Sequence, residues 1–582
     1  MFRIRRIYDD VLPINRTAID QVQQILRSQF PDLAARDIDK LPRQLTNPLK
    51  HRFRAILYIA ENQRRLVVGF ALLLHEPELQ FGYLEFISAA RKLTGRGIGG
   101  ALYQRVREEI RTLGAIGLFF ECLPDDPDLC GDPVILKENR ARLRFYERYG
   151  ARPITGTAYE TPVKEGQDNP PYLVFDDLGQ DRSLGLRQAR AIVRAVLERK
   201  YKHLCSPEYV NLVVESFVDD PVRLRPRRYR TLASTLQLPE EGIPDDQRIA
   251  LAVTDRHDIH HVRERGYVEA PARIAVILER LQGSSLFETL KVKRFSERHI
   301  TAVHDRDFVR YLKSVCNNLS EEEAVYPYVF PVRNASRPPK DRPTRAGYYC
   351  IDTFTPLTRN AYPAARRAVD CALTAASQLL SGQRLAYALL RPPGHHAERR
   401  LFGGFCYLNS TAVAAHYLSI NGKVAVLDID FHHGNGTQEI FYQRPDVLTL
   451  SIHGHPRFAY PYFSGFADER GAASGQGFNL NLPLPEHLIA ERYQEALQRA
   501  IKRITRYHPD FLVIALGFDT GRGDPTGTWL LGPDDFYANG YTIGALRMPT
   551  LVVQEGGYDT GQLGEYAVKF FSGLRQGAFG RD

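Results

Sequence analysis

Two aspartates and two histidines follow one apolar run in the stretch VLDIDFHHGNGTQ, residues 426–438. If the run is a strand, alternation of side chains places Asp428, Asp430 and His432 on the same side of the chain. Three other apolar runs end in equally polar turns: RLAYALLRPPGHH, DFLVIALGFD and TLVVQEGGY. Ligands bind beyond the carboxyl ends of the strands in an open parallel sheet. We therefore expect the four turns to converge on one polar site.

The residue types at these turns predict a metal centre. Asp430 and His432 are two positions apart and can bind one ion, and Asp519 from DFLVIALGFD adds a second carboxylate. Such a set leaves coordination positions open for water, as a catalytic zinc site requires. Fe²⁺ remains an alternative, because geometry and availability matter as much as ligand type. We expect Asp428, one step deeper in the strand, to support the ligands rather than to bind the ion.

The other two turns offer groups for proton transfer. His395 and His396 in RPPGHHAE are candidates for the proton exchange that hydrolysis needs near neutral pH. Tyr558 in EGGY presents a phenol that can donate a hydrogen bond to a developing oxyanion. Next to an open metal position, these groups predict a hydrolase.

Four motifs closely resemble the zinc-dependent histone deacetylase superfamily, from about residue 248 to the end: RPPGHHAERRLFGGFCYLN, VLDIDFHHGNGTQEIFY, LGFDTGRGDP and EGGYD. The resemblance implies an arginase-like α/β fold with a parallel sheet flanked by helices. It implies a Zn²⁺ site formed by Asp430, His432 and Asp519. It also casts His396 as general base and acid and His395 as its electrostatic partner, oriented by Asp428. Tyr558 would polarise the amide carbonyl together with the metal.

One position distinguishes this chain from many members of that superfamily, which read HHGDG where this chain reads HHGNG. Asn435 would therefore give the second histidine a neutral partner, a variant that looks like the class II and bacterial branch. The resemblance further implies aromatic channel walls at Phe405 and Phe463. A structural monovalent cation such as K⁺ is also typical of the family.

The substrate class depends on less specific features. SIHGHPRFAYPYFSGFADERGAASGQG and AGYYCIDTFTP look most like acetylpolyamine amidohydrolases. A cationic substrate needs carboxylates near the channel mouth, and SEEEAVYP offers Glu321, Glu322 and Glu323, although such a run is also typical of a solvated turn. The acetyl-lysine side chain of a protein remains the competing substrate. A narrow channel would favour acetylpolyamines and an open mouth a polypeptide.

A second chemical motif lies near the start of the chain. ISAARKLTGRGIGGALYQRVREEI runs from a strand through a Gly-rich turn into a helix, whose N–H groups suit a pyrophosphate. With the later NRARLRFYERYGARP, it resembles the GNAT N-acetyltransferases over about residues 1–165. The resemblance implies an acetyl-CoA site that includes Arg96, Gly97, Ile98 and Gly99. It implies Tyr146 as general acid and Glu85 as general base, but Thr94 replaces the usual Gln or Arg and leaves catalysis open.

The chain has 582 residues, which is too many for one ordinary core. The pattern of apolar and polar residues along it changes twice and divides it into three regions. We expect a GNAT-like α/β module over residues 1–165 and a deacetylase-like domain over residues 246–582. Residues 166–245 read as a helical, basic linker region. Within it, LGLRQARAIVRAVLERKYKHL has helical periodicity, and Ser206 before Pro207 is a typical helix N-cap.

Composition excludes several classes of protein. The net charge of +9 is diluted over a long chain and predicts a solvated basic surface rather than a nucleic-acid partner. Seven cysteines without a CxxC pair argue against a disulfide framework or a zinc ribbon and favour reduced thiols in the cytoplasm. No run of about 18 apolar residues occurs, so no membrane span is expected.

Our leading hypothesis is therefore a deacetylase fused to a GNAT-like domain, acting on an acetylpolyamine or on acetyl-lysine. The alternative from another class is an acetyl-reader or nucleic-acid-associated scaffold with weak or no catalysis, in which VRLRPRRYR contributes a basic surface. The complete set of ligands, histidines and tyrosine argues against a pure reader. A homodimer is left open.

Overall fold

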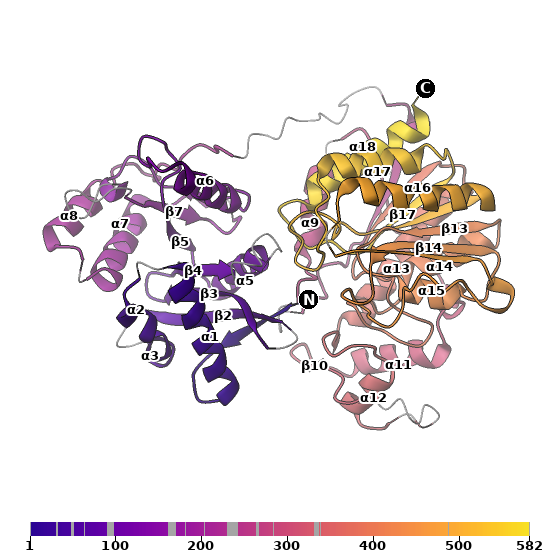
Figure 1. Ribbon diagram of the computed structural model, residues 1–582, viewed down its shortest axis with the longest axis horizontal. Coiled ribbons are helices and arrows are strands. Elements are labelled where there is room, and N and C mark those ends of the chain that lie inside the picture. Colours follow the sequence, from indigo (N-terminus) through magenta and orange to yellow (C-terminus); the bar gives the residue numbers. More distant parts are fainter. Residues whose placement is uncertain are drawn as a thin grey trace. The chain divides into compact units, whose positions relative to one another are not determined.

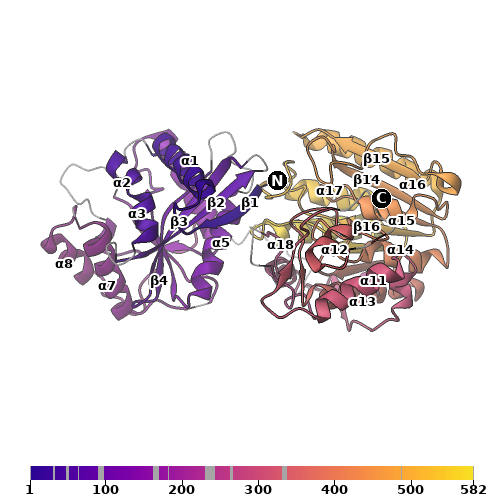
Figure 2. The same cartoon turned by 90° about the horizontal axis from the view of Figure 1, so that it is seen from below.

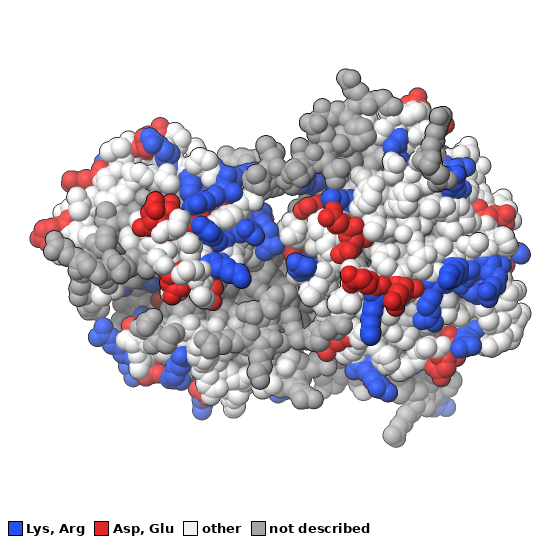
Figure 3. Space-filling model, turned by 45° about the horizontal axis from the view of Figure 1, so that its top comes forward, with Lys and Arg blue, Asp and Glu red and all other residues white. Residues whose placement is uncertain are grey.

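The chain forms two compact units that divide near residue 236. The computed structural model (Figure 1) describes residues 2–30, 33–47, 52–62, 65–89, 98–160, 170–180, 182–202, 204–229, 243–262, 267–282, 284–330, 337, 339–486 and 488–580. Over these residues, none of the helices has the length and hydropathy needed to cross a bilayer. On the face drawn in Figure 3, each unit carries both acidic and basic side chains.

The first unit is built on a seven-stranded sheet of order β1-β2-β3-β4-β5-β7-β6. Its strands are β1 (Phe2–Ile7), β2 (Arg54–Asn62), β3 (Val67–Glu76), β4 (Phe81–Ala89), β5 (Gly117–Cys122), β6 (Arg152–Pro153) and β7 (Tyr172–Asp176). Its helices include α1 (Pro13–Gln29), α2 (Ala35–Asp39), α3 (Leu41–Thr46), α5 (Ile98–Thr112), α6 (Pro133–Glu147), α7 (Leu186–Ala195), the π-helical turn η3 (Val196–Lys200) and α8 (Pro207–Glu215). Apolar residues of α1, α7 and α8 cover one face of the sheet and those of α5 and α6 cover the other, which Figure 2 shows for α1 and α5. This confirms the predicted α/β module.

Residues that the sequence assigns to a linker region contribute to this first core. β7 pairs with β5 and β6, and Ile192 of α7 and Val213 of α8 are buried in the same cluster as Phe119 of β5. Ser206 caps α8, since its Oγ accepts a hydrogen bond from the Tyr209 backbone N–H at 3.2 Å. The first compact unit therefore continues past residue 165.

Strand β4 pairs irregularly with both of its neighbours, β5 and β3, around the predicted general base Glu85. β4 and β5 pair in parallel only from Phe81 with Gly117 to Tyr83 with Phe119. Beyond that point, the register between β3 and β4 skips Glu85. Such a β-bulge redirects a side chain and is common beside active sites.

The second unit contains an eight-stranded sheet of order β15-β14-β13-β16-β17-β12-β8-β9, in which all neighbouring strands are parallel. The strands are β8 (Ile249–Val253), β9 (Phe287–Leu290), β12 (Leu385–Leu389), β13 (Val424–Asp428), β14 (Val447–Gly454), β15 (Asn479–Leu484), β16 (Phe511–Leu516) and β17 (Thr550–Gln554). The strands that precede the four chemical motifs, β13, β16, β17 and β12, are consecutive in this order. The carboxyl ends of all four therefore meet at one edge of the sheet.

Helices cover both faces of this sheet, as predicted. They include α9 (Ala272–Leu281), α11 (Arg306–Asn317), α13 (Ala361–Leu380), α14 (Ser410–Ser419), α15 (Asn435–Phe441), α16 (Ala490–Tyr507), α17 (Pro533–Gly544) and α18 (Leu563–Phe579). In Figure 1, α16, α17 and α18 lie above the sheet, and α13 and α14 lie below it. Two short strands, β10 (Ala324–Val325) and β11 (Leu357–Thr358), pair outside the main sheet.

Candidate active site

The turns after β13 and β16 bring the three predicted metal ligands together. One donor atom from each of Asp430, His432 and Asp519 lies within 4.8 Å of the others, and all three residues are buried. The Nδ1 atom of His432 lies 2.9 Å from Asp519 Oδ2 and 3.2 Å from Asp430 Oδ1. Two carboxylates and one imidazole are thus gathered at one point at the edge of the sheet.

This donor set fits a divalent cation. Burial, together with the negative charge of Asp430, raises the pKa of Asp519 above its ordinary value, so the two carboxylates are held close at an electrostatic cost that a cation would remove. The backbone of the turn after β17 also lies close to the two carboxylates, at a position where only glycine fits. A side chain at Gly556 would place its Cβ 2.5 Å from Asp430 Oδ2 and 2.7 Å from Asp519 Oδ2. Oxygen and nitrogen ligands of this kind suit Zn²⁺ or another borderline metal.

The two histidines of the turn after β12 have different partners. His395 Nδ1 lies 2.9 Å from Asp428 Oδ2, whereas His396 Nδ1 lies 2.8 Å from Asn435 Oδ1. Burial disfavours the charged form of both rings, but Asp428 and Asp430 outweigh it at His395 and raise its pKa to about 10. At His396, burial and the nearby positive charge of His395 lower the pKa well below its ordinary value. His396 is therefore the neutral ring of the pair, as a general base must be.

The neutral partner of His396 is itself bound to a carboxylate that the sequence analysis missed. Asn435 Nδ2 donates a hydrogen bond of 2.8 Å to Glu398 Oε1. Burial raises the pKa of Glu398 to about 7, although the hydrogen bond from Asn435 opposes the shift. Glu398 follows His396 by two residues in RPPGHHAE, but nothing in that motif shows that it contacts the HHGNG turn. A negative charge thus acts on His396 through Asn435.

We expect Glu398→Gln to lower kcat/KM by on the order of 10-fold, as is usual when a supporting hydrogen-bond partner is lost. The raised pKa means that Glu398 is ionised above about pH 7 and protonated below it. Its contribution should therefore be present above that pH and disappear as the pH falls, and the variant should lack this inflection. The measurement is a pH profile of kcat/KM, with the exposed Glu495→Gln on α16 as matched control. An unchanged pH profile in Glu398→Gln would rule out that Glu398 acts on His396 through Asn435.

Tyr558 is held on the Gly-Gly turn by residues from distant segments. Its backbone N–H donates to Asp524 Oδ2 at 2.5 Å, and the guanidinium of Arg273 lies 4.7 Å from the centroid of its ring. Arg273 Nε also donates to the Gly557 carbonyl at 2.5 Å. Burial raises the pKa of Tyr558 well above its ordinary value, so the phenol keeps its proton and can donate it in a hydrogen bond.

A buried ion cluster connects the turn after β12 with the turn after β17. Glu269 accepts hydrogen bonds of 2.7 Å from both Nε and Nη2 of Arg391 and one of 3.1 Å from Arg273 Nη1. The two arginines outweigh the effect of burial and lower the pKa of Glu269 to about 2. The cluster thus joins the segment before the histidines to the turn that carries Tyr558, and no sequence motif indicates it.

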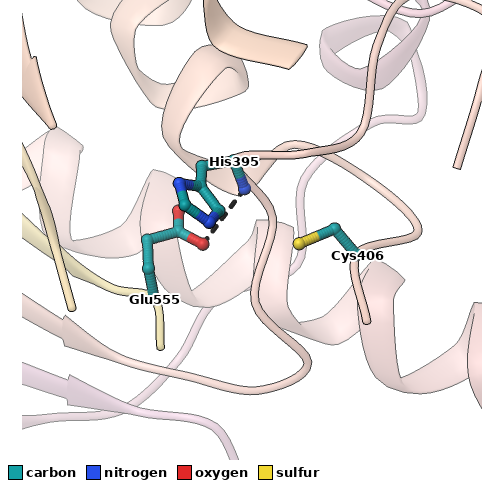
Figure 4. Close-up of side chains that lie close together, drawn as sticks. All are labelled: His395, Cys406 and Glu555. Atoms are coloured by element: carbon teal, nitrogen blue, oxygen red, sulfur yellow. Dashed lines mark hydrogen bonds between the residues drawn. The ribbon is translucent and has the colours of Figure 1, made fainter. Parts of the chain in front are cut away.

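A second group of potential ligands lies beside the first. Donor atoms of His395, Cys406 and Glu555 come within 4.8 Å of one another (Figure 4). However, Glu555 accepts hydrogen bonds from the backbone N–H groups of Gly394 and His395, at 2.6 and 3.0 Å, and from the Thr411 hydroxyl at 2.6 Å. Its carboxylate is thus engaged in holding the turn that carries the histidines.

Aromatic side chains lie beside Tyr558 and beside His396. The Phe405 ring lies 5.7 Å from that of Tyr558 and 4.6 Å from that of Tyr267, between centroids. Tyr460, which the sequence analysis did not single out, places its ring 4.7 Å from that of His396. Phe463 is 54% exposed, and its role as a channel wall stays a prediction.

In the first unit, the predicted general base Glu85 and the predicted general acid Tyr146 contact different sets of residues. Glu85 contacts Gln44 and Lys200, at 3.3 and 3.8 Å. Tyr146 is buried on the α5–α6 face against Phe120, with 4.3 Å between ring centroids, and burial raises its pKa. Ile98 and Gly99 begin α5, whereas Arg96 and Gly97 lie outside the described residues.

Comparison with known proteins agrees with this geometry. The histone deacetylase domain model matches residues 267–574, and the acetyltransferase (GNAT) family model matches residues 19–151. Acetylpolyamine amidohydrolase 2 of Pseudomonas aeruginosa is 38% identical over 334 residues, which cover 55% of this chain and 97% of the relative. Acetylpolyamine amidohydrolase of Burkholderia pseudomallei is 40% identical over 329 residues, covering 54% and 96%. A crystal structure of acetylpolyamine aminohydrolase from B. pseudomallei has a TM-score of 0.53 at 37% identity and covers 56% of this chain and 98% of that chain.

The parallel sheet, the converging turns and the match over more than half of the chain show that the protein belongs to the histone deacetylase family. Its second unit is an amidohydrolase of that family. More particularly, the protein is a deacetylase fused to an acetyltransferase-like domain of the GNAT family. The resemblance predicted from the four deacetylase motifs and the two GNAT motifs is thereby confirmed.

Proposed function

We propose that the second unit is a Zn²⁺-dependent deacetylase that hydrolyses N-acetylated polyamines to amine and acetate. The observation that carries this proposal is the buried set of Asp430, His432 and Asp519 beside a neutral His396 and a protonated Tyr558. The relatives named as acetylpolyamine amidohydrolases, 38 and 40% identical over nearly their whole length, support the substrate class. Metal-dependent acetate release from such a substrate is the experiment that tests it.

The protein groups divide the reaction between them. A Zn²⁺ ion held by Asp430, His432 and Asp519 would supply a Lewis acid that polarises the amide and makes water acidic near neutral pH. His396 takes the proton from the attacking water and later returns it to the leaving amine. Tyr558 donates a hydrogen bond to the oxygen that becomes negatively charged.

The residues around His396 determine which of its nitrogens carries a proton and how strongly the ring binds a second one. Asn435 accepts the Nδ1 proton of His396, so that Nε2 is the nitrogen that exchanges the proton. His395, kept positively charged by Asp428, lowers the proton affinity of His396 and so favours return of the proton to the amine. A site that only bound acetyl groups would not need a base oriented in this way.

The carboxylates for the substrate's cation are Glu321, Glu322 and Glu323, which are exposed just before β10. We expect the triple Gln variant to raise KM for an acetylpolyamine by about 3- to 10-fold, since exposed charge pairs contribute roughly 0.2–1 kcal/mol each. The effect should shrink at high salt. Steady-state kinetics with N-acetylputrescine measure it, and Asp534→Asn, a distant exposed charge, serves as control. A KM equal to that of wild type would exclude these residues and leave an acetyl-lysine peptide as the stronger candidate.

For the first unit, we propose that it binds acetyl-CoA at the N-terminus of α5. The GNAT match over residues 19–151 supports this, and so does the Gly-rich sequence before Ile98. Calorimetric titration of the full chain with acetyl-CoA tests it. Absence of binding at near-millimolar concentration would leave the unit without a cofactor role.

A further inference from the structure

A lysine of the first unit lies against the carboxylate predicted to be a general base. The π-helical turn η3 ends at Lys200, whose Nζ lies 3.8 Å from Glu85 Oε1. The two side chains are 17% and 5% exposed, respectively. π-Helical turns are rare and occur frequently at functional sites. Lys200 belongs to the segment after the GNAT match, which ends at residue 151.

Tyrosine rings surround the same ammonium group. Lys200 Nζ lies 4.3 Å from the centroid of the Tyr201 ring and 5.2 Å from that of Tyr83, and it donates to Tyr201 Oη at 3.1 Å. Tyr201 in turn donates to Glu121 Oε2 at 2.5 Å. The lysine is therefore held by cation–π contacts and lies beside Glu85, with Glu121 reached through the Tyr201 hydroxyl, rather than extending into solvent.

The backbone places these carboxylates where β4 and β5 stop pairing. Glu85 is the extra residue of the bulge in β4, and Glu121 lies two residues beyond the last β5 residue paired with β4. In a unit of the acetyltransferase family, this arrangement sets an amine beside a carboxylate that can accept its proton.

We propose that Lys200 is an acetyl acceptor of the first unit, so that the chain acetylates itself. The proposal rests on the proposed binding of acetyl-CoA. Glu85 accepts a proton from the Lys200 ammonium, and the resulting amine attacks the carbonyl carbon of the thioester. A C–N bond forms, the C–S bond breaks, and the proton that the attacking nitrogen then loses protonates the departing CoA thiolate. The products are Nε-acetyl-lysine and CoA.

The test is mass spectrometry of the full chain after incubation with acetyl-CoA, in the His396→Ala background so that the deacetylase cannot remove the product. We expect close to one acetyl group per chain, at Lys200. The rate should be independent of protein concentration, because acceptor and base belong to the same unit. Lys202 is the internal control, since it is exposed two residues away and would react at least as fast with acetyl-CoA without catalysis.

Two variants sharpen the test. Glu85→Gln should slow acetylation of Lys200 by 10-fold or more and leave acetyl-CoA binding unchanged, whereas Lys200→Arg should remove the modification and keep the positive charge. Binding of acetyl-CoA without acetylation of Lys200 would overturn this proposal alone, as would equal modification of Lys202. Failure of acetyl-CoA to bind would overturn both this proposal and the cofactor proposal.

Discussion

We expect Asp519→Asn to lower the rate of acetate release at least about 1,000-fold and to abolish stoichiometric binding of the proposed Zn²⁺. The variant removes one of two carboxylates from the proposed ligand set, whose donor atoms lie within 4.8 Å of one another. Loss of a Lewis acid costs several kcal/mol of transition-state stabilisation, and each 1.4 kcal/mol is about 10-fold in rate. Kinetics together with elemental analysis of the purified variant measure the two effects.

The substitution should leave the fold intact. Asp519 Oδ1 accepts a hydrogen bond of 2.9 Å from the Phe431 backbone N–H, and the amide oxygen of an asparagine can accept the same bond. Thermal unfolding of the metal-free variant should therefore match that of metal-free wild type. Asp534→Asn, an exposed change in the same unit, is the matched control. Retention of zinc and of normal turnover by Asp519→Asn would remove this residue from the site.

We expect Tyr558→Phe to lower kcat by about 10²–10³, the usual effect of losing a hydrogen-bond donor to an oxyanion. The ring itself should stay in place, because its contacts with Phe405 and with the Arg273 guanidinium, at 5.7 and 4.7 Å, do not involve the hydroxyl. Zinc content and KM should therefore remain close to those of wild type. This combination distinguishes the variant from Asp519→Asn, which loses the metal as well.

The control for Tyr558→Phe is Tyr541→Phe, which removes the hydroxyl of a tyrosine of α17 that is 44% exposed in the same unit. Wild-type turnover in Tyr558→Phe would show that the phenol does not stabilise the transition state. The role assigned to the Gly-Gly turn would then be structural only.

The centre of the deacetylase site could be predicted because each part of it follows a buried strand. Four apolar runs with polar ends predict a parallel sheet, and the ends of neighbouring parallel strands must meet. The pairs His395 with Asp428 and His396 with Asn435 were implied by the family resemblance, and their hydrogen-bonding atoms lie 2.9 and 2.8 Å apart.

The residues that support the site could not be predicted in this way. Glu269 lies outside every motif, and its contact with Arg391 joins positions 122 residues apart. The contact of Glu398 with Asn435 depends on how two turns fold against each other. Such contacts arise from tertiary packing, and neither periodicity nor spacing in one sequence contains them.

In the first unit, local patterns predicted strands and a helix cap but not the sheet's extent. β7 joins the sheet from the segment taken for a linker, where its five buried residues lie between β5 and β6. The bulge at Glu85 has no local signal in the sequence, since it arises from the register of β4 against β3.

The most direct test of the central claim is acetate release by the purified full chain, loaded with Zn²⁺ or stripped by a chelator. N-Acetylputrescine and acetylspermidine should be compared with an acetyl-lysine peptide, each with wild type and with His396→Ala. We predict release that requires the metal, is faster from the polyamines and is lost in His396→Ala. Metal-independent release, or none from any of the three substrates, would contradict the assignment of Asp430, His432, Asp519 and His396 to a deacetylase site.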